Sequence, residues 1–218
     1  IKKNKINNLI YASTSSVYGN NNGNKLNESY LNNKPLQFYS ATKIANEAMS
    51  FAYSNLYNFN SVGLRFFTVY GPWGRPDMAI YKFTQDIINK KKINLYKVGS
   101  NYVNRDFTYI DDVINSIILI FENMKKEKIV DVFNIGNGRP ESIKSVINLI
   151  EKNLNLKSKI SVKQLGIAEM NITNCDISKF KKKFKYKPNT KIESGIHKFI
   201  NWYKEYKNLN WSQEYMNP

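Results

Sequence analysis

The sequence predicts an α/β protein built on a parallel sheet. Short apolar segments that are typical of strands alternate along the chain with segments of helical periodicity. The first apolar run, Asn8 to Ala12, is followed directly by a cluster of hydroxyl residues. Open parallel sheets carry their chemistry at the carboxyl ends of their strands, so this cluster favours a parallel sheet with a site at its edge.

The elements follow one another in a regular order. A buried parallel strand is expected at the first apolar run, and polar residues between 28 and 35 lead into a long, alanine-rich helix. We expect further strands at 61–66, 93–98, 130–135 and 160–162, and helices at 38–57, 78–90, 109–123, 143–154 and 192–206. There is no internal repeat, and no linker in the sequence marks a domain boundary.

Composition excludes several classes of protein. The 218 residues carry a formal net charge of +16, but only four of the 33 basic residues are arginine, and the lysines are spread through helices rich in Asn and Ile. This pattern indicates a coding bias toward lysine, so we expect no nucleic-acid partner, and the remaining arginines mark positions where a planar bidentate group is needed. No apolar stretch reaches the ~18 to 20 residues of a membrane span, so we expect no membrane partner.

Cysteine and histidine are nearly absent. Cys175 and His197 are the single residues of their kinds, which excludes an internal disulfide and leaves no cluster of metal ligands. We expect both to be structural, and we expect no metal site.

A tyrosine and a lysine lie one helical turn apart at the start of the long helix. Tyr39 and Lys43 have the spacing i and i+4, which brings them to one helix face. There the lysine ammonium stabilises the phenolate, which makes the phenol a usable base at neutral pH. Such a pair is common by chance, but the hydroxyl cluster at the end of the first strand, Thr14, Ser15 and Ser16, supports the hypothesis that the pair is catalytic.

These motifs, with three others, resemble the extended short-chain dehydrogenase/reductase (NAD-dependent epimerase/dehydratase) family. The segment Arg65 to Ala79, RFFTVYGPWGRPDMA, is similar to the signature of its UDP-glucuronate 4-epimerases, and Arg105 to Asp112 and Asn134 to Asn137 agree with it. The resemblance extends from about residue 6 to about residue 207. It implies a Rossmann-type parallel sheet with a smaller α/β substrate-binding domain, and NAD as cofactor.

The resemblance also implies roles for single residues. Tyr39 is then the acid/base, Lys43 tunes it and holds the nicotinamide ribose, and Thr14 binds the sugar 4-hydroxyl. Ser15 and Ser16 are candidate substrate contacts, although hydroxyl groups at strand ends also cap helices. The remaining substrate contacts that the family implies are Thr68 at the sugar or diphosphate, Arg75 at the glucuronate carboxylate and Arg105 at the diphosphate.

Ser16 bears on the type of reaction. Decarboxylases and dehydratases of this superfamily carry an acidic residue in the corresponding segment, which here reads TSSVYG. The missing acid favours an epimerase, which oxidises and reduces the sugar again without losing a group.

One family motif is missing from the sequence. The ten glycines never form the G-x-x-G-x-x-G turn that holds the cofactor pyrophosphate at a helix N-terminus. We therefore expect the chain to be the C-terminal part of a longer enzyme and to be inactive by itself. In that interpretation residues 1–70 are a remnant of the NAD-binding domain, 71–218 mainly bind the UDP-sugar, and 109–135 return to the NAD-binding domain.

The resemblance thus implies a cytoplasmic NAD-dependent isomerase that converts UDP-glucuronate to UDP-galacturonate for surface polysaccharide. The complete protein is expected to be a homodimer. Alternatives are a UDP-hexose or UDP-N-acetylhexosamine 4-epimerase, a UDP-glucuronate decarboxylase, and a non-catalytic fragment of such an enzyme.

Overall fold

The computed structural model describes residues 3–4, 6–19, 25–30, 34–166 and 171–208, and the structural statements that follow concern these residues. Three small sheets and six α-helices make up the described chain. None of the helices within these ranges is long and apolar enough to cross a membrane.

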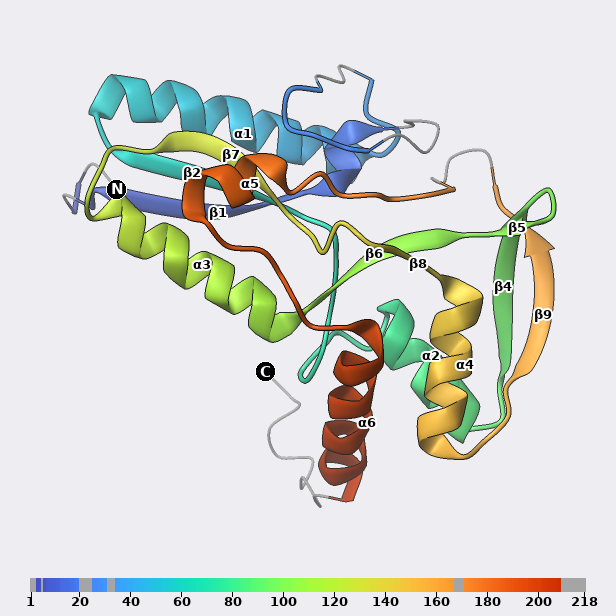
Figure 1. Cartoon of the computed structure of the whole chain (residues 1–218). Helices are drawn as coiled ribbons and strands as arrows, with labels where there is room; N and C mark the ends of the chain where they lie inside the picture. The colour runs from blue at the N-terminus through green and yellow to red at the C-terminus, as the bar shows by residue number, and fades with distance from the viewer. Residues whose placement is uncertain (1–2, 5, 20–24, 31–33, 167–170, 209–218) are drawn as a thin grey trace.

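The first sheet is parallel and has the order β1-β2-β7. Its strands are β1 (Asn8–Thr14), β2 (Asn60–Phe66) and β7 (Val130–Ile135). Figure 1 shows α1 (Phe38–Tyr57) along one face and α3 (Ile110–Met124) along the other. On the α3 face, α5 (Ser178–Phe184) adds Phe180 and Phe184 to a core that includes Phe133 of β7. The two faces of the sheet carry different side chains, because successive residues of a strand point to opposite faces.

The β1–β2 register sets the edge at which the sheet ends. Ser13 lies opposite Arg65 and Thr14 lies opposite Phe66, so both strands end at the same level. A short 3-10 helix, η1 (Ser15–Tyr18), follows β1 directly. This edge is the carboxyl edge of a parallel sheet, where the hydroxyl cluster is expected to act.

The rest of the chain forms a second region around two further sheets. The first of these has the order β3-β6-β8 and the second the order β5-β4-β9. Their strands are β3 (Thr68–Tyr70), β4 (Lys92–Val98), β5 (Asn101–Tyr102), β6 (Asn104–Tyr109), β8 (Pro140–Ser142) and β9 (Lys159–Gln164). The helices α2 (Ala79–Ile88), α4 (Ile143–Leu154) and α6 (Ile192–Asn208) pack around the largest core of the protein, which includes Ile87, Ile147 and Phe199.

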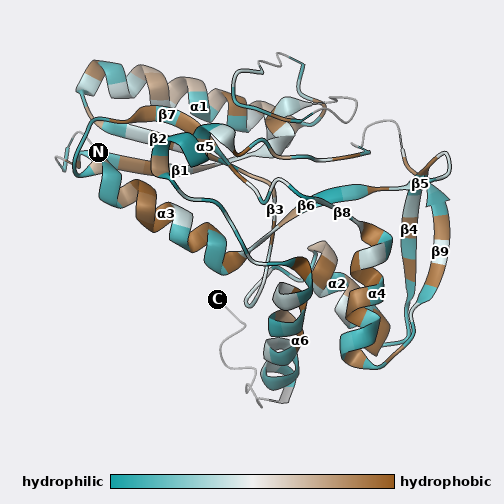
Figure 2. Ribbon diagram, in the orientation of Figure 1, coloured by the Kyte–Doolittle hydropathy of each residue, from teal (hydrophilic) through white to brown (hydrophobic). Residues whose placement is uncertain are grey.

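Helix periodicity was a good predictor in this chain. The expected helices at 38–57 and 143–154 have these same bounds, and the other three differ by one or two residues at an end. In Figure 2, apolar and polar residues recur around α3 and α4, as is typical of helices with one buried face. The strand at 130–135 also has the expected bounds.

Several expectations were wrong or incomplete. The first strand is half-buried rather than buried, because within the described residues it pairs on one side only, with β2. The strands β3, β5, β6 and β8 and the helix α5 were not expected as elements. These are short segments whose strand or helix character depends on a partner elsewhere in the chain, which periodicity does not report.

Asp106 is fully buried and holds together segments that are distant in sequence. Its carboxyl oxygens accept hydrogen bonds from the backbone N–H groups of Asn137 at 2.7 Å, Gly138 at 2.8 Å and Cys175 at 3.0 Å. Burial raises the pKa of Asp106 above its ordinary value, although these donors favour the ionised form. Because Asp106 follows Arg105 in β6, it fixes the strand that carries one of the candidate substrate residues.

Cys175 is buried in the same region and packs closely against Gly136. Its Sγ lies 2.4 Å from the position that a Cβ on Gly136 would occupy, so only glycine fits there. Burial raises the pKa of the Cys175 thiol well above its ordinary value, which keeps the sulfur protonated and unreactive.

We expect Asp106→Asn to lower the free energy of unfolding by about 2 to 3 kcal/mol, because the amide offers one acceptor oxygen and turns N–H donors toward backbone donors. Urea unfolding monitored by circular dichroism measures the change. Asp111→Asn, at an exposed carboxyl in the first turn of α3, is the control and should change stability by less than about 1 kcal/mol. If both variants unfold at the same urea concentration, the backbone contacts of Asp106 do not carry the stability assigned to them.

Candidate active site

Tyr39 and Lys43 lie at the N-terminal end of α1, above the carboxyl edge of β1. The Lys43 Nζ donates a hydrogen bond to the carbonyl oxygen of Ala12 at 3.0 Å and lies 5.7 Å from the centre of the Tyr39 ring. Tyr39 is 52% exposed, so its phenol is accessible to a bound molecule. The helical spacing therefore brings the two side chains together as the sequence predicts.

The hydroxyl cluster begins where β1 ends. Thr14 is the N-cap of η1, and its Oγ1 accepts a hydrogen bond from the Ser16 N–H at 3.2 Å and lies 3.3 Å from the Ser16 Oγ. Ser15 is buried beside it in η1. Thr14 and Ser16 thus contact each other, and the capping contact that hydroxyl groups often make is present at this strand end.

A cavity of about 360 Å³ lies in the second region. Thr68 of β3 and Arg105 of β6 line it, together with Lys82, Asn94 and Tyr96. Thr68 comes two residues after Phe66, the partner of Thr14 in the sheet, so the cavity begins close to the carboxyl ends of β1 and β2. Its size falls within the range of small-molecule sites, and its lining combines apolar and aromatic side chains with three basic residues and the acidic Asp86.

Arg105 is fixed within the cavity wall. Its Nη1 donates to the backbone carbonyls of Asn104 at 2.9 Å and Asn171 at 3.1 Å. These contacts orient the guanidinium in the cavity wall, and the binding of a diphosphate by Arg105 stays a prediction.

Arg75 lies on the loop between β3 and α2 and is well exposed. Its guanidinium makes a two-point contact with Asp77, from Nε to Oδ1 at 3.2 Å and from Nη2 to Oδ2 at 2.9 Å. Arg75 also lines a small cavity that shares Thr68 and Met78 with the larger one. The structure therefore brings Arg75 near Thr68 and gives its guanidinium a carboxylate partner that sequence reasoning did not foresee.

Aromatic contacts hold the loop of Arg75 in place. Trp73 has a φ of +62°, in the left-handed region that large side chains seldom adopt. Its ring lies 5.5 Å from the rings of Trp202 and Tyr206 on α6. Packing against α6 offsets the backbone strain and restricts where Arg75 can reach.

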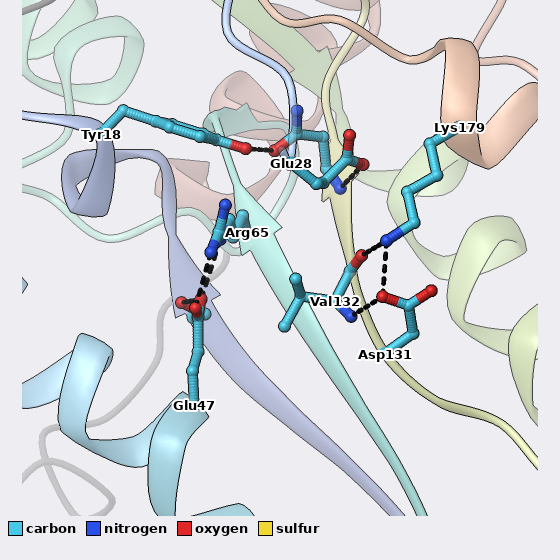
Figure 3. A network of polar contacts seen from close by, with 9 residues as sticks. Tyr18, Glu28, Glu47, Arg65, Asp131, Val132 and Lys179 are labelled. Carbon is cyan, nitrogen blue, oxygen red and sulfur yellow. Dashed lines mark hydrogen bonds and ion pairs between the residues drawn. The ribbon is translucent and has the colours of Figure 1, made fainter. Parts of the chain in front are cut away.

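A buried polar network below the catalytic candidates was not predicted. The Arg65 guanidinium donates to both carboxylate oxygens of Glu47, from Nε at 2.9 Å and Nη2 at 2.7 Å (Figure 3). Ser13 donates to Glu47 Oε1 at 2.5 Å. Burial lowers the pKa of Arg65, but the hydrogen bonds and charge of Glu47 together with the interaction with Tyr18 outweigh burial, so the pKa is raised. A sequence signal existed, since Glu47 continues the i, i+4 series of Tyr39 and Lys43.

The network continues to the end of β7. Arg65 lies 4.9 Å from the centre of the Tyr18 ring, and the Tyr18 phenol donates to the Asn134 Oδ1 at 2.6 Å. Burial raises the pKa of Tyr18 to about 12, so the phenol stays protonated and remains a donor. The Asn134 amide in turn donates to the carbonyls of Leu26 and Asp176.

The arrangement at the strand end is suited to proton transfer. A phenol with a neighbouring ammonium and a strand-end hydroxyl can move a proton at the oxygen of a bound molecule. No group of three or more His, Cys, Asp or Glu side chains that suits a metal ion occurs within the described ranges.

Comparison with known proteins gives the family. The model of the NAD dependent epimerase/dehydratase family matches residues 1–136. Protein CapI of Staphylococcus aureus is 39% identical over 216 residues, which cover 92% of this chain and 64% of that protein. UDP-glucuronate 4-epimerase 1 of Arabidopsis thaliana is 38% identical over 215 residues, which cover 93% of this chain and 50% of that protein.

Solved structures give the same result. The structure of UDP-glucuronic acid 4-epimerase from Bacillus cereus, in complex with UDP-glucuronic acid and NAD, matches with a TM-score of 0.83 and 33% identity. The match covers 93% of this chain and 63% of that one. The chain therefore spans from half to just under two thirds of the length of these relatives.

Proposed function

Because the chain belongs to the NAD-dependent epimerase/dehydratase family, we propose that it carries the catalytic residues and the sugar-nucleotide side of a UDP-glucuronate 4-epimerase. The product is UDP-galacturonate, and the reaction passes through a transient 4-keto sugar. The observation that carries the proposal is the position of Tyr39 and Lys43 at the carboxyl edge of β1, the strand that ends at Thr14. The cavity lined by Thr68 and Arg105 supports it. The named relatives from Arabidopsis and Bacillus cereus support the choice of substrate.

The residues fit the nicotinamide end of the cofactor. An ammonium has three N–H donors, so the bond from Lys43 to Ala12 still allows Lys43 to bind ribose hydroxyls, and Tyr39 is exposed beside it. Tyr39 and Lys43 would hold this end of NAD, which supplies hydride acceptance from carbon 4 and its return. The sequence contains no G-x-x-G-x-x-G turn, so the same residues do not account for binding of the pyrophosphate.

The chain's own groups move one proton. The Tyr39 phenolate takes the proton of the sugar 4-hydroxyl, while Thr14 donates a hydrogen bond to the same oxygen and Lys43 stabilises the phenolate. The keto sugar then rotates in the site so that it presents its other face, and Tyr39 returns the proton to the oxygen at carbon 4. The proton and the hydride both return to the sugar, so the net change is inversion at one carbon.

Arg75 selects the acid sugar in this proposal. A 4-keto glucuronate is a β-keto acid, which loses carbon dioxide when its carboxylate aligns with the ketone. A two-point guanidinium contact holds that carboxylate out of alignment and also recognises it. The two-point contact of Arg75 with Asp77 supports this role, because it demonstrates that the side chain can bind a carboxylate in this geometry.

A second candidate is an epimerase of UDP-hexose or UDP-N-acetylhexosamine. The same Arg75–Asp77 contact favours it if Asp77 remains in place when substrate binds, since the guanidinium then has no capacity for a sugar carboxylate. Serine at position 16 argues against decarboxylation, in which an acidic residue assists. Ser15 and Ser16 are proposed to line the sugar site beside Thr14.

We also propose the assignment of regions and the assembly. Residues 1–70 and 109–135 belong to the cofactor side, and the remainder of 71–218 belongs mainly to the UDP-sugar side, with α5 packed against the sheet of the cofactor side. Exposed apolar side chains of α1, including Phe38, Met49 and Leu56, support burial against another surface, which agrees with a homodimer. A cytoplasmic enzyme that supplies acid sugars for surface polysaccharide fits this substrate.

Tyr39→Phe should reduce turnover by roughly 10²- to 10⁴-fold, because the proton acceptor is lost while the ring and its packing remain. Turnover is measured in the full-length protein with NAD and UDP-glucuronate. Tyr53→Phe, at another exposed tyrosine of α1, is the matched control and should keep wild-type turnover. Retention of more than about a third of the turnover by Tyr39→Phe would remove Tyr39 as the base.

Arg75→Ala should weaken binding of UDP-glucuronate by about 2 kcal/mol, and it should release UDP-pentose, because the unrestrained 4-keto acid loses carbon dioxide. Calorimetry gives the affinity, and mass analysis of the products gives the pentose. In the control Asp77→Asn, Arg75 keeps its guanidinium, so no pentose is expected. If Arg75→Ala binds UDP-glucuronate normally and yields no pentose, the substrate is a neutral UDP-sugar and Arg75 orders the loop.

A further inference from the structure

Helix α1 carries Tyr39 and Lys43 but is weakly packed by apolar contacts. Only Ser40 and Ser54 of its 20 residues are buried, and Ile44 alone among its apolar residues joins one of the core clusters of the described chain. Its N-cap residue, Gln37, makes no side-chain capping bond. Apolar packing therefore does little to set where this helix sits along the sheet.

Polar contacts provide the restraint instead. Glu47 lies one turn beyond Lys43 and two turns beyond Tyr39, on the side of α1 that faces the strands. Its side chain is 13% exposed and contacts Ser13 of β1 and Arg65 of β2, which are direct partners in the sheet. One carboxylate thus links the helix to both strands at the same level.

Glu47 binds the sheet at the same position along β1 as the catalytic candidates. Ser13 immediately precedes Thr14, and Ala12, one residue earlier, accepts the hydrogen bond from Lys43. Any sliding of α1 along the sheet would break the two-point contact with Arg65 and would move Tyr39 and Lys43 relative to Thr14. The contact with Arg65 is geometrically strict because two nitrogens of the guanidinium each bind one oxygen of the carboxylate.

We propose that Glu47 is a positioning residue, which sets the register of α1 on the sheet and so fixes Tyr39 and Lys43 against Thr14. This inference rests on the proposed function for its catalytic consequence, whereas the restraint on the helix stands independently of any substrate. Buried ion pairs contribute weakly to net stability, and specification of a register is a role in which they are well attested.

The test compares Glu47→Gln with Glu151→Gln in the full-length protein. Glu151 of α4 is a matched control, because its side chain is 10% exposed and accepts hydrogen bonds from Ser158 and Lys157 outside the site. Glu47→Gln should lower kcat roughly 10- to 100-fold, since an error near 1 Å in a catalytic group has effects of that order, and should change KM by less than about threefold. Glu151→Gln should leave both constants at wild-type values.

Hydrogen exchange measured by mass spectrometry gives a readout that needs no activity. Exchange in residues 38–57 should become at least about tenfold faster in Glu47→Gln and should not change in Glu151→Gln. If wild-type protein turns over no UDP-sugar, the proposed function fails and exchange alone decides: faster exchange confined to α1 supports the restraint, and unchanged exchange overturns it.

Two further outcomes overturn the proposal. The first is a kcat of Glu47→Gln within twofold of wild type, and the second is an equal loss of kcat in Glu151→Gln. If Glu47→Gln does not fold, the double variant Glu47→Leu with Arg65→Met removes both buried charges and replaces the single variant. Its kcat should again fall at least tenfold, and a wild-type kcat in the folded double variant contradicts a positioning role.

Discussion

The burial of the Arg65 guanidinium within a parallel sheet constrains this structure more than any other single interaction. Removing a charge from water costs several kcal/mol unless it is paired and hydrogen-bonded, so the surroundings of Arg65 have little freedom. Glu47 must approach from α1, and the Tyr18 ring packs against the guanidinium from the segment after β1. Tyr18 then binds Asn134 at the end of β7. Helix α1, the 3-10 helix η1 and strand β7 are therefore all arranged around the Arg65 side chain at the sheet edge.

The sequence was informative about fold wherever a segment is long and periodic. Helix α1 was predicted with its observed bounds although it is poorly buried, because its composition favours a helix regardless of packing. Strands β3, β6 and β8 were missed, because each becomes a strand only by pairing with segments that are remote in sequence. Likewise, β1 was expected to be buried from its apolar residues, yet burial depends on neighbours on both sides, which composition cannot report.

In the candidate site, contacts between residues close in sequence could be predicted, and contacts between residues distant in sequence could not. Tyr39 and Lys43 are four residues apart, so the helix period alone predicts their proximity. Glu47 and Arg65 are 18 residues apart and meet only because α1 crosses β2 at that level, which no local pattern encodes. The two-point contact of Arg75 with Asp77 was within local reach but was not foreseen, because Asp77 was read only as part of a motif.

The few arginines of this lysine-rich chain lie at positions where the guanidinium makes specific contacts. Arg65 and Arg75 each bind one carboxylate through two nitrogens, and Arg105 binds two carbonyls through one nitrogen. A lysine has a single nitrogen and cannot form the two-point contacts of Arg65 and Arg75, whereas the single-nitrogen contacts of Arg105 do not require that geometry. Burial then separates their roles: the Arg65 side chain is 7% exposed and closed on Glu47, whereas that of Arg75 is 73% exposed. An exposed ion pair contributes about 1 kcal/mol or less, so Asp77 restrains Arg75 only weakly, whereas removal of Glu47 would leave the buried charge of Arg65 unpaired.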